Sequence, residues 1–162
     1  MKKTLIIHAG MHKTGTTTIQ RWLSESSNLS GLYAYRHAGN NCNMGLPLFT
    51  LFGSKPEDHF FWKSRGTAKD ELSEKLSKAK SRYTKVLEDQ STCALPIHII
   101  SSEDISNFSA TEFSRLKRFF EPYYTIIKVI QFVRNPFTYL DSAFQEKVKT
   151  GYDQFILDKF IP

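Results

Sequence analysis

The sequence predicts an α/β fold in three layers, with helices on both faces of a central parallel sheet. Three apolar runs have the length and composition of strands, at residues 4–9, 96–101 and 125–133, and helical patterns lie between them. Strands that alternate with helices at these lengths pair in parallel through right-handed crossovers. Ligands of such sheets bind where the strands end at their carboxyl side, so we expect a functional site there.

The length and composition predict one soluble domain over residues 1–162. With 162 residues and 40% apolar residues, the chain can bury a core, which argues against disorder. No apolar run approaches the roughly 18 residues of a membrane span, and the stretch after Met1 is too short for a secretory signal. Cys42 and Cys93 lie far apart without a metal-like spacing, as expected for reduced thiols. The sequence therefore predicts a cytoplasmic protein.

The charge balance is basic and suits an anionic ligand. The formal net charge is +6, but the lysines are spread along the chain and form no block. We therefore predict no nucleic-acid surface. The sequence leaves the oligomeric state undetermined.

The first helix is expected to follow the segment at 12–17 and to end near 26–28, and an irregular segment at 31–56 comes after it. This segment is rich in Gly, Asn and aromatic residues, and a short strand at 32–35 and a short helix at 46–52 are expected within it. Long irregular segments in compact domains often carry function, so this one could shape a pocket. His59, just beyond it, is interpreted as a structural histidine.

Two later helices have clear signals. From 67 to about 89, apolar residues recur at spacings of four and three, and Thr67 can cap the helix; a coiled coil is the alternative. Ser109 begins a capping box with Glu112, which predicts a helix to about 120.

The first strand leads into the segment His12-Lys13-Thr14-Gly15-Thr16-Thr17, and a helix follows. The first amides of a helix have no partner within it and carry the positive end of its dipole. Gly15 permits an unusual backbone angle, the threonine hydroxyls add donors, and Lys13 adds a positive charge. The predicted ligand is a phosphate or sulfate ester; the alternative is a capped strand-to-helix turn.

The order of these residues distinguishes two kinds of loop. In the nucleoside triphosphatase loop, G-x-x-x-x-G-K-[ST], lysine follows the last glycine, whereas Lys13 precedes Gly15 by two residues. The order K-T-G-T-T instead resembles the loop of sulfotransferases that binds the 5′-phosphosulfate of 3′-phosphoadenosine 5′-phosphosulfate (PAPS). The resemblance implies a cofactor-binding set of Lys13, Thr14, Gly15, Thr16, Thr17 and Thr18, although cytosolic members carry tryptophan at the position of Thr18.

A second motif follows the last strand. Asn135 can cap a helix that begins at Pro136, and Arg134 can bind an anion through its planar fork of donors. Arg134-Asn135-Pro136, with Ser142 eight positions after Arg134, resembles the sulfotransferase motif that binds the 3′-phosphate of PAPS. Thr138 replaces an acid often found in that motif.

Three segments are expected to meet at the strand ends, at 12–17, 102–104 and 134–136. Cytosolic sulfotransferases place a histidine base after the middle strand, and carbohydrate sulfotransferases use a glutamate, so the resemblance makes Glu103 the candidate base. His8 and His12 are the alternatives. Glu103 and Asp104 could instead cap the next turn or pair with Lys13 or Arg134.

The resemblance implies a P-loop NTPase-like fold and transfer of the sulfuryl group from PAPS to a hydroxyl, or an amine, of a small-molecule or carbohydrate acceptor. PAP is then the product and no metal is required; Lys13 and Glu103 would be catalytic. Family members are longer, so C-terminal elements are expected to be lacking, with another helix starting near 152. The alternatives are a noncatalytic PAP- or nucleotide-binding protein and a P-loop phosphotransferase, which would need magnesium and ATP.

Overall fold

The computed structural model describes residues 2–38, 42–64, 69–91 and 93–149. The chain divides into two units, residues 1–132 and 133–162. The first unit holds the sheet and the helices that cover it, and the second holds one described helix. That the whole chain forms one domain stays a prediction.

The first unit is built on a four-stranded, all-parallel sheet in the order β2-β3-β1-β4. The central strand β1 (Thr4–His8) pairs with β3 (Ile97–Ser101) on one side and β4 (Ile126–Ile130) on the other. The short β2 (Ala34–Arg36) pairs with β3. The predicted α/β class with a central parallel sheet is confirmed.

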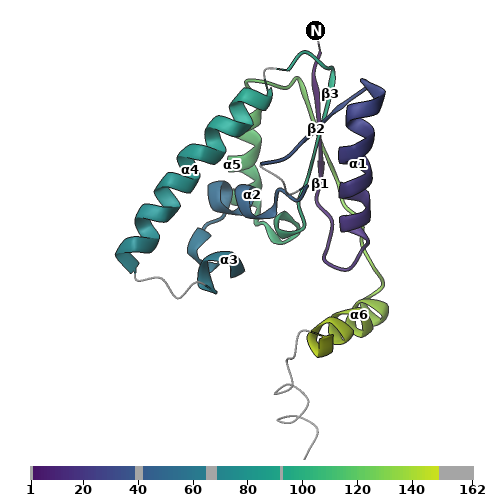
Figure 1. Ribbon diagram of the computed structural model, residues 1–162, viewed down its shortest axis with the longest axis vertical. Coiled ribbons are helices and arrows are strands. Elements are labelled where there is room, and N and C mark those ends of the chain that lie inside the picture. Colours follow the sequence, from purple (N-terminus) through teal and green to yellow (C-terminus); the bar gives the residue numbers. More distant parts are fainter. Residues whose placement is uncertain (1, 39–41, 65–68, 92, 150–162) are drawn as a thin grey trace, which may run out of the picture. The chain divides into compact units, whose positions relative to one another are not determined.

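Helices lie on both faces of this sheet (Figure 1). Helix α1 (Thr16–Ser30) covers one face, and α2 (Gly45–Phe52), α4 (Lys69–Ser91) and α5 (Ala110–Phe120) lie on the other. The predicted helices are therefore present, with ends within a few residues of expectation, whereas Thr67 lies outside the described residues.

Three short elements were not predicted: α3 (Phe60–Lys63) and the 3₁₀ turns at Pro56–Asp58 and Asp104–Asn107. Each is shorter than two α-helical turns, too short to show a hydrophobic period.

The predicted capping box at α5 is confirmed. The Ser109 hydroxyl accepts from the Glu112 backbone N–H at 3.4 Å, and a Glu112 carboxylate oxygen accepts from the Ser109 backbone N–H at 2.8 Å. Two amides that the helix cannot satisfy are thus bonded, which fixes where α5 begins.

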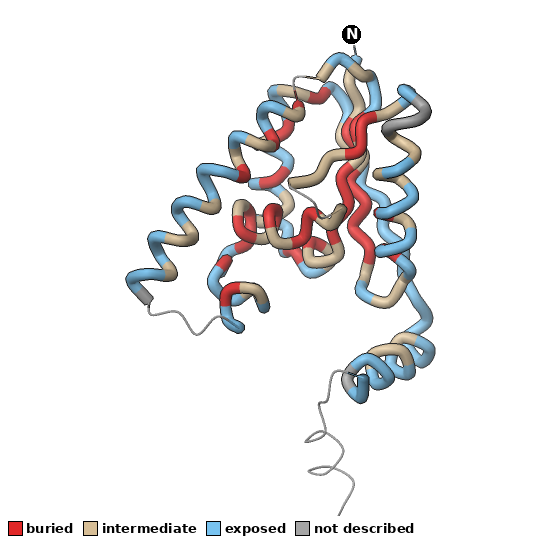
Figure 2. The backbone as a smooth tube through the Cα atoms, viewed as in Figure 1, coloured by how far each residue is buried: buried red, intermediate tan, exposed pale blue. Residues whose placement is uncertain are grey.

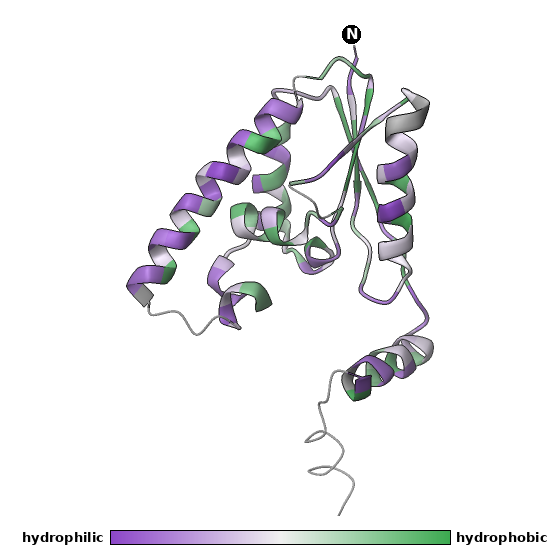
Figure 3. Cartoon of the chain, viewed as in Figure 1, coloured by the Kyte–Doolittle hydropathy of each residue, from purple (hydrophilic) through white to green (hydrophobic). Residues whose placement is uncertain are grey.

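The hydrophobic core lies between the sheet and the α2/α4/α5 layer (Figure 2). Helix α4 carries mostly hydrophilic residues with hydrophobic residues at intervals (Figure 3), and two of these, Tyr83 and Leu87, are buried. Fully or almost fully buried apolar side chains come from strands and helices alike: Leu5, Ile7, Met44, Leu48, Leu87, Ile100, Leu116 and Phe120.

The side chains of strand β4 are more exposed than its apolar sequence suggests. A continuous apolar run is typical of a strand buried on both faces, but Ile126, Val129 and Ile130 are exposed. β4 is also an edge strand, with a hydrogen-bonded neighbour on one side only.

The second unit contains α6 (Pro136–Lys149). The Asn135 side-chain oxygen accepts from the Phe137 backbone N–H at 3.0 Å, and Pro136 takes the first helical position, as predicted. The helix expected near 152 lies outside the described residues. None of the described helices is long and apolar enough to cross a membrane.

At the amino-terminal side of β3, His98 is fully buried in a polar network. Its Nδ1 lies 2.5 Å from the Tyr124 hydroxyl, which donates to the Ser91 hydroxyl at 3.3 Å. Burial, together with the positive charges of Arg36 and Lys3, lowers the pKa of His98 to about 4.

This low pKa predicts acid destabilisation. Between pH 6.5 and about 4 the unfolded chain binds a proton at His98 that the folded chain does not, so stability is full above pH 6.5 and falls as the pH drops. The unfolding free energy should decline by about 2–3 kcal/mol over this window.

Denaturant unfolding of His98→Gln, compared with wild type between pH 7 and 4.5, isolates this contribution from that of His8, whose pKa is also lowered. The variant should show the shallower pH dependence. Parallel curves for wild type and His98→Gln would contradict the assignment.

Candidate functional site

The carboxyl ends of β1, β3 and β4 are joined by backbone hydrogen bonds. The Ser102 N–H donates to the carbonyl of His8 at 2.9 Å, and the Ala9 N–H donates to the carbonyl of Ile130 at 2.8 Å. The His8 imidazole and the Gln20 amide from α1 both contact the Ser101 hydroxyl, at 2.8 and 3.1 Å. The ends of three strands and the start of α1 therefore form one rigid base for the following loops.

The loop after β1 turns into α1 through two residues with positive φ. Lys13 has φ 67° and Gly15, the N-cap of α1, has φ 80°. Glycine takes this conformation without cost, whereas lysine does so rarely, as is common at functional sites. Since Gly15 caps α1 without a side-chain hydrogen bond, the amides of Thr16 and Thr17 stand at the positive end of the helix with no acceptor inside it.

Other threonines of the loop have different surroundings. The Thr14 hydroxyl donates to the carbonyl of Met11 at 2.7 Å, and this bond fixes the turn. Thr17 and Thr18 are exposed, whereas Thr16 is buried. The predicted binding set thus shares one loop, but the hydroxyls of Thr14 and Thr16 are engaged by the protein.

Glu103 ties the turn after β3 to this loop. One of its carboxylate oxygens accepts from the Thr16 hydroxyl in a short hydrogen bond, and the other lies 2.7 Å from Nδ1 of His12. Two of the three segments predicted to converge, 12–17 and 102–104, therefore meet directly.

Asp104 extends the contact to a further histidine. Its carboxylate lies 3.7 Å from Nε2 of His12 and 3.5 Å from Nε2 of His59. The other ring nitrogen of His59 accepts from the Phe61 backbone N–H at 3.1 Å and so caps α3. Gly45 makes room for Asp104 at the start of α2, where a Cβ would collide with the carboxylate.

The pKa values follow from this arrangement. Hydrogen bonds from Asp104 and Glu103 raise the pKa of His12 to about 10, against a smaller effect of burial. Burial would raise the pKa of Asp104, but the hydrogen bonds and charges of His12 and His59 outweigh it and lower that pKa strongly. At neutral pH His12 is therefore an imidazolium between two carboxylates.

The two alternative bases differ in environment. His12, already protonated at neutral pH, cannot take a proton from an acceptor. Burial lowers the pKa of His8, and that ring is enclosed, with Nδ1 on Ser101 and its edge against Phe132. Of the three candidate bases, Glu103 is the one whose side chain contacts both Thr16 and His12 of the loop.

The second motif lies in the second unit. Nε of Arg134 donates to the Thr138 hydroxyl at 3.2 Å, and this hydroxyl donates to the carbonyl of Asn135 at 3.1 Å. Ser142 is half-buried on α6. Thr138, which departs from the sulfotransferase motif, thus contacts the arginine directly.

Sequence reasoning missed the histidines that hold the acidic pair. His12 was weighed as a base and His59 as a structural residue, but their link through Asp104 was not anticipated. In the sequence, this link shows only as two adjacent acidic residues after a strand. That pattern does not indicate which histidines they contact.

Comparison of the chain with protein-family models, curated proteins and solved structures found no match. Within the described part of the chain, no group of three or more His, Cys, Asp or Glu side chains could hold a metal ion.

The raised pKa of His12 predicts destabilisation by base. Protonated His12 stabilises the fold fully below pH 6.5, and this contribution is lost as the pH rises towards 10. Half of the His12 side chain is exposed, so solvent screening should limit the loss to about 1 kcal/mol.

Chemical denaturation of wild type and His12→Asn at pH 6, 8 and 9.5 measures this loss. The difference between the two proteins should shrink as the pH rises. A difference that stays constant with pH would show that His12 contributes no charge.

Proposed function

We propose that this chain is a cytoplasmic sulfotransferase that transfers the sulfuryl group of PAPS to a hydroxyl, or an amine, of a small-molecule or carbohydrate acceptor. The observation that carries the proposal is the loop after β1, where Lys13 and the Gly15 N-cap lie at the start of α1, at the carboxyl edge of a parallel sheet. The P-loop NTPase-like fold is part of the same proposal.

The sulfotransferase resemblance assigns two sets of residues to PAPS. Lys13 and the amides of Thr16 and Thr17 suit the 5′-phosphosulfate, because donors at a helix start favour an anion. Arg134 and Ser142 suit the 3′-phosphate, since guanidinium binds phosphate through two parallel hydrogen bonds. PAPS supplies an activated sulfuryl group, and its departing 5′-phosphate gains charge that Lys13 would stabilise.

Glu103 is the proposed base. The acceptor oxygen attacks sulfur, the bond from sulfur to the 5′-phosphate oxygen breaks, and the acceptor proton moves to Glu103. A positioned base of this kind contributes about 10²- to 10⁴-fold to the rate. The Thr16 hydroxyl and the His12 imidazolium hold this carboxylate in place beside the loop.

One observation favours a second candidate function, a noncatalytic protein that binds PAP or a related nucleotide. Both oxygens of Glu103 already accept from protein donors, so taking the acceptor proton would require one of these contacts to break. In this case Glu103 shapes the loop and no acceptor is turned over.

Titration calorimetry with PAP, ATP and GTP tests the proposal, with and without magnesium. We expect magnesium-independent binding of PAP and at least tenfold weaker binding of ATP and GTP. Magnesium-dependent preference for ATP would indicate a phosphotransferase instead. PAP binding combined with no sulfate transfer to a panel of hydroxyl and amine acceptors would support the noncatalytic protein.

Lys13→Ala should abolish sulfate transfer, by at least 10²-fold, because the departing 5′-phosphate loses its cation. Transfer of radiolabelled sulfate from PAPS measures this, and circular dichroism should show an unchanged fold. Lys55→Ala, an exposed lysine outside the loop, is the matched control. Retained turnover in Lys13→Ala would count against the assignment.

Arg134→Ala should weaken PAP binding about 10- to 100-fold and leave AMP binding nearly unchanged, because only PAP carries the 3′-phosphate. Calorimetry with the two nucleotides gives the ratio, and Arg118→Ala on α5 is the control. If the preference for PAP over AMP survives in Arg134→Ala, the 3′-phosphate binds elsewhere.

A further inference from the structure

Buried polar atoms without a hydrogen-bond partner gather in one corner of the first unit, around Cys93. Among the described residues, six buried side-chain nitrogen or oxygen atoms lack a partner, and four of them belong to Arg36, Gln90 and His98. A buried polar atom without a partner is costly, and folded proteins contain few of them. Their concentration in one corner indicates a polar site that takes a small ligand.

The sheet brings Arg36 and His98 to the same face. Strand β2 pairs with β3 so that Ala34 lies opposite His98 and Arg36 lies opposite Ile100. Because side chains alternate between the two faces of a sheet, Arg36 and His98 lie on the face of Ile100, which packs in the core with Leu87 of α4. The corner is therefore enclosed between the sheet and α4.

The end of α4 supplies the third side chain and leads to the thiol. The Gln90 amide donates to the carbonyl of His37 at 2.6 Å, and its Oε1 is a buried acceptor that no described residue bonds. The Cys93 backbone N–H donates to the carbonyl of Gln90 at 3.4 Å. Cys93 itself is only partly buried, so its thiol is accessible from solvent.

Two side chains direct unused hydrogen-bonding atoms at this turn. Nε and Nη2 of Arg36 form one edge of the guanidinium, a fork that binds two neighbouring oxygen atoms, and both are buried without a partner in the described part of the chain. His98 is fully buried, and its Nδ1 contacts the Tyr124 hydroxyl. The other ring nitrogen, Nε2, also lacks a partner among the described residues and faces the backbone of Leu95 and Cys93.

The surroundings of Cys93 favour its thiolate. A hydrogen bond from the Leu95 backbone lowers the pKa of the thiol most; burial raises it less, and Arg36 and Lys3 lower it further. The thiolate is the nucleophilic form of cysteine, and oxidants select accessible cysteines with a low pKa.

We propose that Cys93 is a peroxide-reactive cysteine, and that Arg36 and Gln90 hold hydrogen peroxide against its sulfur. Hydrogen peroxide has two adjacent oxygen atoms that accept from the Arg36 fork, and its hydrogens can be donated to Oε1 of Gln90. An anion would satisfy the fork but not this acceptor. The site is independent of the proposed sulfate transfer.

The reaction is a two-electron oxidation of the thiolate. The Cys93 sulfur attacks one peroxide oxygen, an S–O bond forms and the O–O bond breaks. The other oxygen leaves as hydroxide, stabilised by the Arg36 N–H groups, and takes up a proton to become water. Cys93 becomes a sulfenic acid, and two equivalents of a thiol reduce it back through a mixed disulfide.

Trapping of sulfenic acid with dimedone, followed by mass spectrometry, tests the proposal. The chain has two cysteines, so Cys42→Ser leaves Cys93 alone and Cys93→Ser leaves Cys42 alone. With hydrogen peroxide, Cys42→Ser should form sulfenic acid about tenfold faster than Cys93→Ser, or more. Adding Lys13→Ala to Cys42→Ser should leave the rate unchanged. Equal rates for the two cysteines would overturn the proposal.

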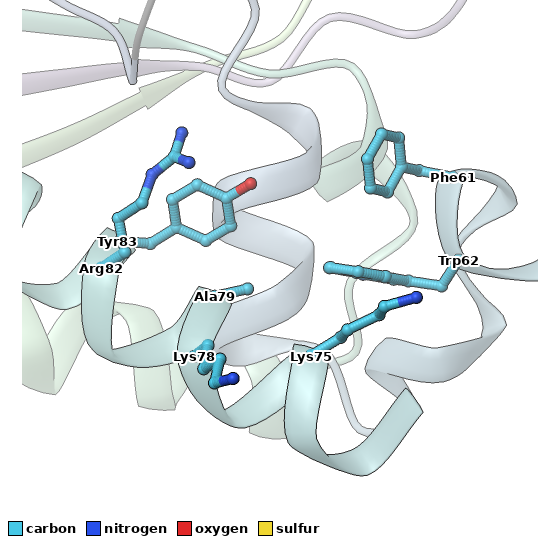
Figure 4. Close-up of a pocket in the computed structure, with 7 residues that line it drawn as sticks. All are labelled: Phe61, Trp62, Lys75, Lys78, Ala79, Arg82 and Tyr83. Atoms are coloured by element: carbon cyan, nitrogen blue, oxygen red, sulfur yellow. The ribbon is translucent and has the colours of Figure 1, made fainter. Parts of the chain in front are cut away.

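Arg36→Lys in the Cys42→Ser background keeps a positive charge but removes the fork. It should slow oxidation by peroxide about tenfold and slow alkylation by iodoacetamide far less, because iodoacetamide requires the thiolate but not the peroxide site. Gln90→Leu should have the same selective effect. Arg82→Lys, whose guanidinium lies beside the Tyr83 ring on α4 (Figure 4), is the control and should change neither rate.

Circular dichroism checks the fold of each variant. If Arg36→Lys and Gln90→Leu slow the two reactions to the same extent, the corner holds only water and the peroxide site is wrong. If Arg82→Lys slows oxidation as much as Arg36→Lys does, the effect is one of overall charge and the inference also fails.

Discussion

The carboxylate of Glu103 is the contact on which the arrangement of the site depends. It accepts from Thr16 at the start of α1 and pairs with His12 in the loop before it, and so joins the turns after β1 and β3. Lys13 and Gly15 in this loop both take positive φ. Local backbone strain is thus balanced by a contact between distant parts of the chain, as expected where a loop must hold one shape.

The fold was largely predictable because its signals are local. The strand-loop-helix at the N terminus, the capping box of Ser109 and the cap at Asn135 each depend on residues within a few positions of one another. The position of β4 was less predictable. Its apolar run reads as a buried strand, and only the order of strands in the sheet makes it an edge.

The site was predicted in part, for a related reason. The sequence predicted that the loop and Glu103 lie at the same edge of the sheet, because the carboxyl ends of parallel strands lie at one edge. It could not assign the partners, since Thr16 and Glu103 are 87 residues apart and no period relates them. The bridge from Asp104 through His59 to α3 had even less signal, because α3 is one turn long.

The charge of His12 bears on how the loop proposed to bind an anion can lie beside two acids. Glu103 and Asp104 would repel a phosphate or sulfate near Lys13, and the helix start alone carries only about half a positive charge. The imidazolium between these carboxylates offsets their field, and they in turn keep it protonated by raising its pKa to about 10. One imidazolium between two carboxylates offsets part of their negative charge, so the acidic pair and the histidine form one partly neutralised unit beside the start of α1.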